Sequence, residues 1–296
     1  MTELVERTIP VSVRIRMAHA AVQTLATQHE VDLLHIKGVA LDPRLSFPGR
    51  SSADADVLCR PEHVAPLLLA MRKSGWSLLN SFTKSSAFEH SATLHHPTWG
   101  WLDLHRQYPG LGRDPATAFD TLWATRGEAT IAGVPCAVPA LPDQAVLLLL
   151  HAARSPGEQK ARADVAHVWS SATPESRDAI LSSVDRLGAD LAFAVVLGTL
   201  EEHRDHPEYA LWRIASTGGT RLDEWRARVR AARGLRAKMR VVARSTLVNA
   251  EHLALTGRPT GPKDLVVEFF ARPIRGVKEQ YAVVRLRRRG RGRADG

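Results

Sequence analysis

The sequence predicts an α/β protein of the α+β type, in which a mixed β-sheet domain is followed by a helical domain. Up to about residue 140, short apolar runs bounded by Gly, Pro and polar residues alternate with amphipathic helical patterns. Beyond that point the apolar periodicity is helical throughout. With 296 residues, 44% of them hydrophobic, the chain is long enough for about two domains that each bury a core.

The first half alternates between the two kinds of element. In chain order, the patterns predict helices over residues 17–29, 61–75 and 115–126, strands over 31–38, 52–59, 76–81, 91–97 and 99–105, and a hairpin over 127–139. Gly75 is expected to end the second helix, since glycine adopts the left-handed conformation without strain. Ala132 and Gly133 provide the turn of the hairpin.

The second half is predicted to be helical over residues 141–154, 173–203 and 220–255. Asp143 is the expected N-cap of the first helix, whose apolar run forms a buried face. Gly188 and Gly234 are expected to interrupt the two longer patterns. The Pro-rich segment "VPALPD" marks the boundary, which gives domains over residues 1–140 and 141–284 and a tail over 285–296.

Most of the positive charge lies near the C-terminus. The chain has a net charge of +9, and residues 272–296 alone contain nine Lys or Arg and two acidic residues. The segment "RLRRRGRGRADG" is rich in Gly and Arg and lacks apolar periodicity, which is typical of disordered tails. Such a tail suits a solubilising role, or binding to RNA, an acidic membrane surface or an acidic protein.

The sequence favours a cytoplasmic location. Its first residues, "MTELVERTIP", lack the basic-then-apolar order of a signal peptide. The longest apolar stretches are far shorter than the roughly 18 residues that span a bilayer. With only Cys59 and Cys136, no disulfide framework is expected.

Three aspartates mark the predicted site. Asp54 and Asp56 occur in "GRSSADADVLCRP", and because side chains alternate along a strand, both lie on one face. Adjacent carboxylates repel each other, so a cation or water is expected between them. The later strand "WGWLDLH" places Trp101, Asp103 and His105 on one face. If the two strands are neighbours, three carboxylates converge, which suits Mg²⁺, or Mn²⁺ in its place, together with substrate phosphates.

These motifs resemble those of a known superfamily. Lys-Gly after a strand, Asp-x-Asp on the next strand and a third Asp on a later strand resemble the polymerase-β-like nucleotidyltransferases. More narrowly, "HIKGVAL", "PGRSSADADVLCRPEHV" and "WGWLDLHR" are similar to a largely uncharacterised bacterial nucleotidyltransferase family, over about residues 30–170. The resemblance implies that residues 1–140 form the catalytic domain, that Asp54 and Asp56 bind the metal ions, and that Asp103 completes the cluster.

The resemblance also implies contacts to the phosphates of a nucleoside triphosphate such as ATP. Gly38 would let the backbone approach a phosphate at the N-terminus of the helix that Lys37-Gly38 opens. Lys37 and Arg50 are candidate phosphate contacts, although Arg50 would equally pair with an acid. Lys160, after the helix "LLLLHAAR", would reach the triphosphate or remain on a solvated helix face. The superfamily has Gly-Gly or Gly-Ser where this chain has Gly38-Val39, so Lys37 would supply positive charge in place of a hydroxyl.

The predicted function is Mg²⁺-dependent transfer of a nucleoside monophosphate from the triphosphate to an acceptor hydroxyl. A sugar or another small molecule suits a compact cleft, RNA suits the basic tail, and a protein side chain is a third class of acceptor. The alternative is a non-catalytic protein of the same fold that recruits an anionic partner through its tail, which the intact aspartates disfavour. His105 is either structural or orients a metal ligand or the acceptor, and the histidines over residues 90–105 match no compact zinc motif.

Overall fold

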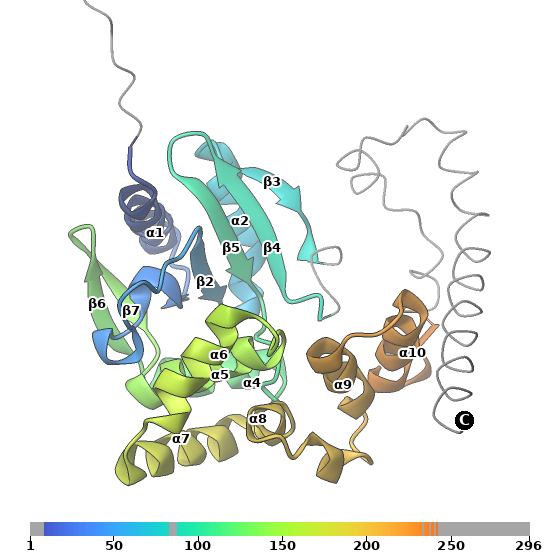
Figure 1. Cartoon of the computed structure of the whole chain (residues 1–296). Coiled ribbons are helices and arrows are strands. Elements are labelled where there is room, and N and C mark those ends of the chain that lie inside the picture. Colours follow the sequence, from blue (N-terminus) through green and yellow to red (C-terminus); the bar gives the residue numbers. More distant parts are fainter. Residues whose placement is uncertain (1–8, 83–87, 233, 237, 240, 242–296) are drawn as a thin grey trace, which may run out of the picture. The chain divides into compact units, whose positions relative to one another are not determined.

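Figure 1 shows the computed structural model, which describes residues 9–82, 88–232, 234–236, 238, 239 and 241. The chain divides into two compact units, with the division between Leu200 and Glu201. The first unit combines a mixed sheet with helices, which confirms the predicted fold class. The predicted basic tail over residues 285–296 lies outside the described residues.

A five-stranded sheet forms the framework of the first unit. Its strands are β1 (Leu33–Ile36), β2 (Ala55–Cys59), β3 (Ser77–Asn80), β4 (Ser91–His96) and β5 (Gly100–His105), in the order β1-β2-β5-β4-β3. Each lies inside a predicted strand range. The central pair β2 and β5 is parallel, and the other three pairs are antiparallel. Parallel neighbours need a long crossover, which here contains α2 (Val64–Lys73), β3 and β4.

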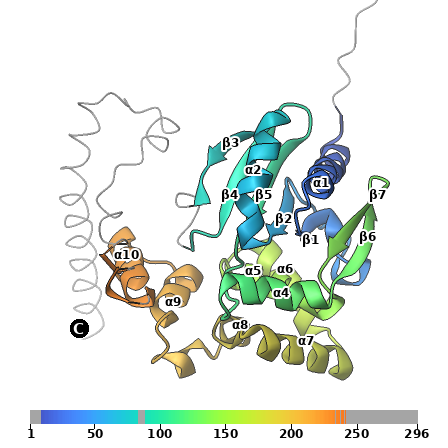
Figure 2. The same ribbon diagram turned by 180° about the vertical axis from the view of Figure 1, so that it is seen from behind.

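Helices α1 (Val11–Gln28) and α2 cover one face of this sheet (Figures 1 and 2). The core beneath them contains Val57 of β2 and Leu102 and Leu104 of β5, all fully buried. Because side chains alternate along a strand, the residues between these apolar ones point to the opposite face. The two helices therefore fix which face of the sheet is left for polar chemistry.

A second, two-stranded sheet lies beside β1. Strands β6 (Gly127–Ile131) and β7 (Val134–Val138) form the predicted hairpin, whose turn residues Ala132 and Gly133 have φ of 49° and 80°. Positive φ at both turn positions matches the right-handed twist of a two-residue hairpin. Helix α4 (Pro115–Ala124) precedes the hairpin, and the Asp114 side chain accepts a hydrogen bond from Thr117 N at its start.

A set of helices follows the hairpin in the first unit. It comprises α5 (Leu141–Ala153), α6 (Gln159–Val165), a π-helix (Ala166–Ser170), α7 (Pro174–Leu187) and α8 (Asp190–Leu197). Gly188 ends α7 in the left-handed conformation, as the expected break. These helices belong to the same compact unit as the sheet. The domain boundary near residue 140 stays a prediction.

Asp143 joins α5 to α7 and to the end of α4. The sequence predicted it as the N-cap of α5, but Ala140 takes that position and Asp143 lies in the first turn, fully buried. Its carboxylate accepts hydrogen bonds from Ser183 Oγ over 2.5 Å and Thr125 Oγ1 over 2.9 Å, and it pairs with Arg186. The tertiary partners explain the difference, since a buried carboxylate is stable only when its oxygens are satisfied.

The second unit contains α9 (Tyr209–Thr217) and α10 (Arg221–Ala231), which pack against each other. Thr220 and Asp223 form a capping box at the start of α10. The predicted helix over residues 220–255 is thus described only in its first part, and its continuation beyond residue 241 lies outside the described residues.

Candidate active site

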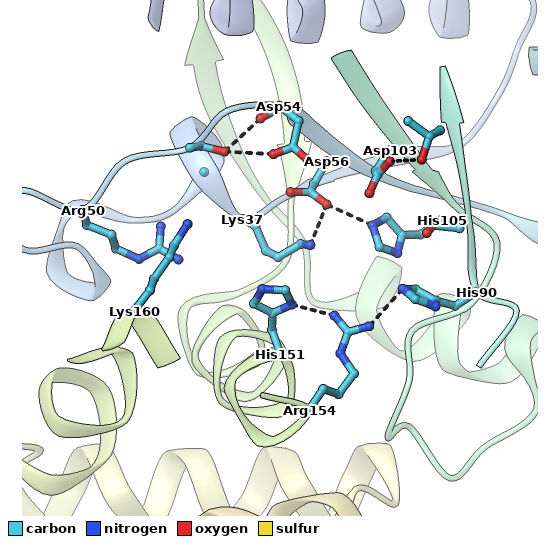
Figure 3. A pocket seen from close by; sticks show the side chains of 14 residues that line it. Lys37, Arg50, Asp54, Asp56, His90, Asp103, His105, His151, Arg154 and Lys160 are labelled. Atoms are coloured by element: carbon cyan, nitrogen blue, oxygen red, sulfur yellow. Dashed lines mark hydrogen bonds and ion pairs between the residues drawn. The ribbon is translucent and has the colours of Figure 1, made fainter. Parts of the chain in front are cut away.

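Asp56 and Asp103 lie side by side at the centre of the sheet. Strands β2 and β5 pair in a register that makes these two residues direct partners. Both point away from α1 and α2, since their neighbours Val57 and Leu104 belong to the core. Asp54 lies just ahead of β2 and lines the same pocket. The three aspartates converge in a pocket of about 300 Å³ (Figure 3).

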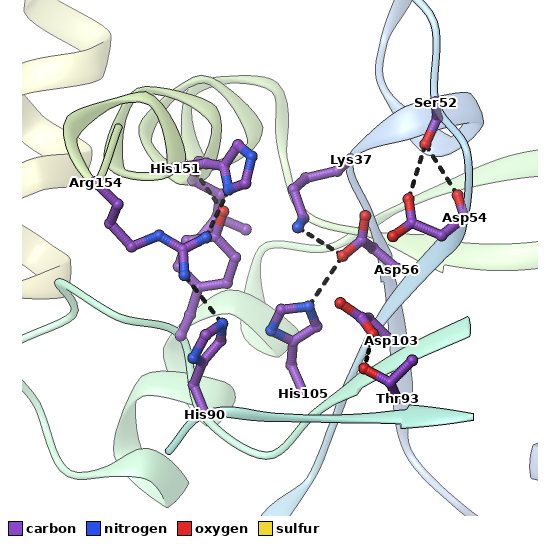
Figure 4. A network of polar contacts seen from close by, with 12 residues as sticks. Lys37, Ser52, Asp54, Asp56, His90, Thr93, Asp103, His105, His151 and Arg154 are labelled. Carbon is purple, nitrogen blue, oxygen red and sulfur yellow. Dashed lines mark hydrogen bonds and ion pairs between the residues drawn. The ribbon is translucent and has the colours of Figure 1, made fainter. Parts of the chain in front are cut away.

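Asp56 is buried and shares its Oδ1 between two donors. Lys37 Nζ lies 2.5 Å from this oxygen and His105 Nε2 lies 3.0 Å from it (Figure 4). Burial alone would raise the pKa of Asp56, but the Lys37 ammonium and the hydrogen bond from His105 hold that pKa far below its usual range. Burial lowers the pKa of His105 to about 4, so a neutral imidazole donates from Nε2 to an ionised Asp56.

The other two aspartates are each held by a hydroxyl. Thr93 Oγ1 donates to Asp103 Oδ1 over 2.8 Å, and Ser52 Oγ lies 3.3 Å from Asp54 Oδ1. Burial, and then the charge of Asp56, raise the pKa of Asp103 to about 6 and also raise the pKa of Asp54. The cluster thus holds negative charge that its surroundings do not fully offset, and this favours cation binding.

Lys37 and Gly38 form a tight turn at the end of β1. Their φ angles are 57° and 52°, and a Cβ on Gly38 would lie 3.1 Å from Ser52 Oγ, so the turn packs closely on the loop before β2. The prediction that Lys37-Gly38 opens a helix is wrong beyond a single turn, because Gly38–Ala40 is a 3-10 helix of 3 residues. The residue before Pro43 is pushed out of the helical region, which prevents the turn from extending. The predicted phosphate site at a helix N-terminus therefore lacks its helix, although Gly38 lines the pocket.

Arg50 and Lys160 also line the pocket. Arg50 Nε donates to Asp164 Oδ1 over 2.7 Å, in an ion pair whose side chains are 4% and 1% exposed. Arg50 thus has the acid partner that the sequence left open, and part of its charge is offset. Lys160 is exposed, and its Nζ donates to Ser51 O over 2.8 Å. Phosphate contacts by either residue stay a prediction.

The pocket lies between an acidic wall from the sheet and a basic wall from the helices (Figure 3). The sheet wall carries the three aspartates, and the helical wall carries His151 and Arg154 at the end of α5 and Lys160 in α6. All predicted site residues line it: Lys37, Gly38, Arg50, Asp54, Asp56, Asp103 and Lys160.

Several residues of the pocket were not assigned to the site from the sequence, among them His90, His151 and Arg154. Arg154 Nη1 lies 3.0 Å from His90 Nε2, and Arg154 Nη2 lies 2.5 Å from His151 Nδ1 (Figure 4). His151 and Arg154 carried a usable signal, since they are polar residues three apart at the end of an otherwise apolar helix and so share a face. His90, in the segment before β4, carried no comparable signal.

The donor set fits a hard divalent cation. Asp56, Asp103 and His105 each offer one ligand atom, and these atoms lie within 4.8 Å of one another. Mg²⁺ prefers carboxylate oxygens to imidazole nitrogens, and the His105 Nε2 proton is directed at Asp56. The aspartates, with Asp54 beside them, therefore suit Mg²⁺ or Mn²⁺ better than the histidine does. Which of them hold the ion stays a prediction.

Comparison with the models of known families identifies the family of this chain. The model of a family described as uncharacterised nucleotidyltransferases matches residues 3–204, which is more than half of the chain. The chain belongs to this family. The membership confirms the resemblance noted from the sequence, and the matched range contains every residue of the pocket.

Solved structures and curated sequences add little more. The chain is similar to an antigenic nucleotidyltransferase-like protein from Paracoccidioides brasiliensis, with 16% identity, coverage of 62% of this chain and 92% of that one, and a TM-score of 0.38. It is also similar to the antibiotic-resistance factor ANT(2'')-Ia, with 17% identity, coverage of 67% and 100%, and a TM-score of 0.44. No curated protein matches the chain. Within the described residues, no helix has the length and apolar character needed to cross a membrane.

Proposed function

We propose that this nucleotidyltransferase moves a nucleoside monophosphate from a nucleoside triphosphate to an acceptor hydroxyl, in a metal-dependent reaction. The observation that carries the proposal is the register of β2 and β5, which makes Asp56 and Asp103 direct partners on the wall of a pocket. The raised pKa of Asp103 supports a site that is completed by a cation. Membership of the family supports the same class of reaction.

The residues of the sheet wall would perform the transfer. Mg²⁺, or Mn²⁺, held by Asp54, Asp56 and Asp103, would offset phosphate charge and make the acceptor hydroxyl more acidic. Asp103 accepts the proton of that hydroxyl, the acceptor oxygen bonds to the α-phosphorus, and the bond from the α-phosphorus to the pyrophosphate oxygen breaks.

Lys37, Arg50 and Lys160 are the proposed phosphate contacts, with Gly38 leaving room for the approach. An ammonium has three donors, and Asp56 takes one of those on Lys37, so others remain for phosphate oxygens. Lys160 reaches the pocket from α6, and among the described residues its ammonium bonds a carbonyl and no carboxylate, which leaves its charge available. Arg50 retains N–H groups beyond the two that bond Asp164.

The proposed acceptor is a sugar or another small molecule. A pocket of about 300 Å³ is compact, which favours a small acceptor over a folded macromolecule. RNA and protein hydroxyls are the other classes to include in an acceptor screen. The proposal concerns the phosphates and the acceptor and makes no choice of base, so all four triphosphates belong in the test.

The first prediction separates the three aspartates. Asp54→Asn and Asp56→Asn should each weaken triphosphate binding in Mg²⁺ and abolish transfer. Asp103→Asn should keep much of the affinity and lower turnover by about 10²-fold or more, the usual scale for loss of a positioned base. Calorimetry with the four triphosphates in Mg²⁺, Mn²⁺ or chelator measures binding, and pyrophosphate release measures transfer.

Asp178→Asn, which neutralises an exposed carboxylate on α7, is the matched control and should behave as the wild type. If the triphosphate binds as tightly in excess chelator as in Mg²⁺, the proposed role of the metal ion in triphosphate binding is wrong. Full activity in Asp103→Asn would show that another group accepts the proton of the acceptor hydroxyl. Wild-type behaviour of all three variants would refute the proposed nucleotidyl transfer at this site.

A further inference from the structure

The helical wall of the pocket holds a guanidinium whose hydrogen-bond partners are both imidazoles. Arg154 donates from Nη1 to His90 Nε2 and from Nη2 to His151 Nδ1 (Figure 4). Within the described parts of the chain, no carboxylate lies within ion-pair distance of Arg154, although three aspartates line the same pocket. Arg154 Nε is buried and also lacks an acceptor there. The pocket thus contains a positive charge without a negative partner.

The contacts with Arg154 fix the state of both imidazoles. A guanidinium has only donors and keeps its proton, so His90 Nε2 and His151 Nδ1 must each present a lone pair. The second ring nitrogen of each then carries a hydrogen. Burial, and then neighbouring positive charge, lower the pKa of His151 to about 2, which agrees with a neutral ring. His151 Nε2 is therefore an N–H donor, and no acceptor bonds it among the described residues.

A purely structural role explains only part of this arrangement. Arg154 is the C-cap of α5, where the helix dipole favours a cation. A capping arginine, however, would direct its N–H groups at the last carbonyls of the helix. Arg154 instead turns toward the pocket and orients His151, three residues earlier on the same face of α5. The outcome is a set of oriented donors, from Arg154 and His151, that the protein itself does not use.

We propose that Arg154 and His151 form an oxyanion subsite for the terminal phosphates of the bound nucleoside triphosphate, and for the pyrophosphate that leaves. The proposal rests on the proposed function. A planar guanidinium matches phosphate oxygens with two parallel hydrogen bonds, and the His151 Nε2–H adds a third donor. Every donor nucleotide must bring terminal phosphates to the pocket, whereas an acceptor needs only a hydroxyl. A phosphate on the acceptor has the same chemistry, and the experiment separates the two sources.

The experiment measures binding of inorganic pyrophosphate, ATP and AMP by calorimetry, with and without chelator. Arg154→Met removes the charge at similar length and should weaken pyrophosphate and ATP binding by about 10-fold or more, while AMP binding changes by less than about 2-fold. Arg162→Met is the control, because Arg162 is exposed on the neighbouring helix α6 and does not line this pocket. It should leave all three affinities unchanged.

A second, milder variant keeps the proposal testable if Arg154→Met does not fold. In His151→Asn the side-chain oxygen can still accept from Arg154, but the Nε2–H donor is lost, so pyrophosphate binding should weaken by about 5-fold with an unchanged melting curve. Wild-type pyrophosphate affinity in both variants would overturn the subsite. An unchanged ATP affinity with a raised KM for a phosphorylated acceptor would also overturn it, in favour of an acceptor site. Pyrophosphate binding that depends on Arg154 in a protein without transfer activity would refute the proposed function and leave the subsite standing.

Discussion

At the residue scale, the site places like charges together in a buried setting. Asp56 keeps its charge through Lys37 and His105, whereas its direct partner Asp103 has a pKa raised to about 6 by burial and by the charge of Asp56. In the unfolded chain an aspartate has its ordinary pKa of 3.8. At Asp103 the folded protein therefore binds more protons than the unfolded chain between about pH 4 and pH 6, and the contribution of this residue to stability falls as the pH rises through that window.

Replacing Asp103 by Asn should stabilise the metal-free protein. The amide still accepts from Thr93 but carries no charge, so the repulsion by Asp56 disappears. At pH 7.5 in chelator we expect a gain of about 1–2 kcal/mol, after allowing for partial solvent screening, or a rise in Tm of about 2–6 °C. The gain should vanish below about pH 4, where Asp103 is protonated in both states. Differential scanning calorimetry at the two pH values measures it.

In Mg²⁺ we expect the wild type to be more stable than Asp103→Asn, the reverse of the order in chelator. The ion stabilises the wild type by binding the folded state, and it should stabilise Asp103→Asn less. Asp178→Asn serves again as the exposed control, with no change expected beyond about 0.5 kcal/mol. A destabilised Asp103→Asn variant in chelator would show that Asp103 is neutralised in the native state by a contact other than those described.

The sequence predicted the aspartates of the site better than it predicted which side chains pair with one another around them. Alternation along the strand assigned Asp54 and Asp56 to one face, because a period of two needs no tertiary information. The pairing of Arg50 with Asp164 joins residues more than a hundred positions apart, and no local pattern predicts such a pair. The same holds for Arg154 and His90, which meet only after the helices have packed on the sheet.

At the element scale, the loop after β5 is joined to the end of α7 by two glycines. Gly112 N donates to Gly188 O over 3.0 Å, and a Cβ on Gly112 would lie 2.3 Å from that oxygen. Real Cβ atoms do not approach a carbonyl so closely, and the oxygen belongs to backbone that ends a helix. The loop that follows the strand of Asp103 is therefore held by a contact that only glycine permits.

Gly112→Ala should destabilise the protein by about 1–3 kcal/mol, because the added methyl group forces the two backbone segments apart. Gly157→Ala is the matched control, since a Cβ there meets no atom within 4 Å. It should be neutral, or stabilising by about 0.4–1 kcal/mol through the unfolded state. Urea unfolding of both variants measures the difference. Equal stabilities would mean that the Gly112 loop moves aside at no cost.

Most helices and strands were predictable, because the periodicity of their apolar residues and the Gly and Pro residues at their ends depend only on nearby positions in the sequence. Two predictions at element boundaries were wrong for identifiable reasons. The helix expected after Lys37-Gly38 stops after one 3-10 turn, since Pro43 follows too soon. Asp143 satisfies Ser183 and Arg186 of α7 and so does not cap α5.

At the scale of the whole molecule, the helices that follow the predicted boundary near residue 140 pack with the sheet through contacts that the sequence pattern does not specify. Helices α5 to α8 belong to the compact unit of the sheet, and the division falls at Leu200. Their attachment depends on contacts between distant residues, such as the hydrogen bond from Tyr108 Oη to Leu147 O over 2.6 Å. The change from strand-like to helical patterns near residue 140 gives no information about such contacts.

Buried and half-buried histidines of the first unit make its stability depend on pH. Five of them have a pKa lowered mainly by burial: His19, His35, His90, His105 and His151. His19 of α1 and His35 of β1 bond each other through their Nδ1 atoms over 2.8 Å. A histidine in the unfolded chain has a pKa of 6.5, so the unfolded state binds more protons below that pH. These residues stabilise the unit fully above about pH 6.5 and progressively less as the pH falls toward 4.

We therefore expect the first unit to lose several kcal/mol of stability between pH 7.5 and pH 5. Each proton taken up on unfolding contributes about 1.4 kcal/mol per pH unit. Hydrogen exchange of peptides from residues 9–200 in urea measures this unit without interference from the second. His19→Gln removes one buried titrating group and should flatten the pH dependence by up to one proton, whereas His29→Gln, at an exposed position that ends α1, should not. Equal stability at the two pH values would show that these histidines can be protonated without disturbing the core. Equal effects of the two variants would show that the acid sensitivity of the unit resides elsewhere.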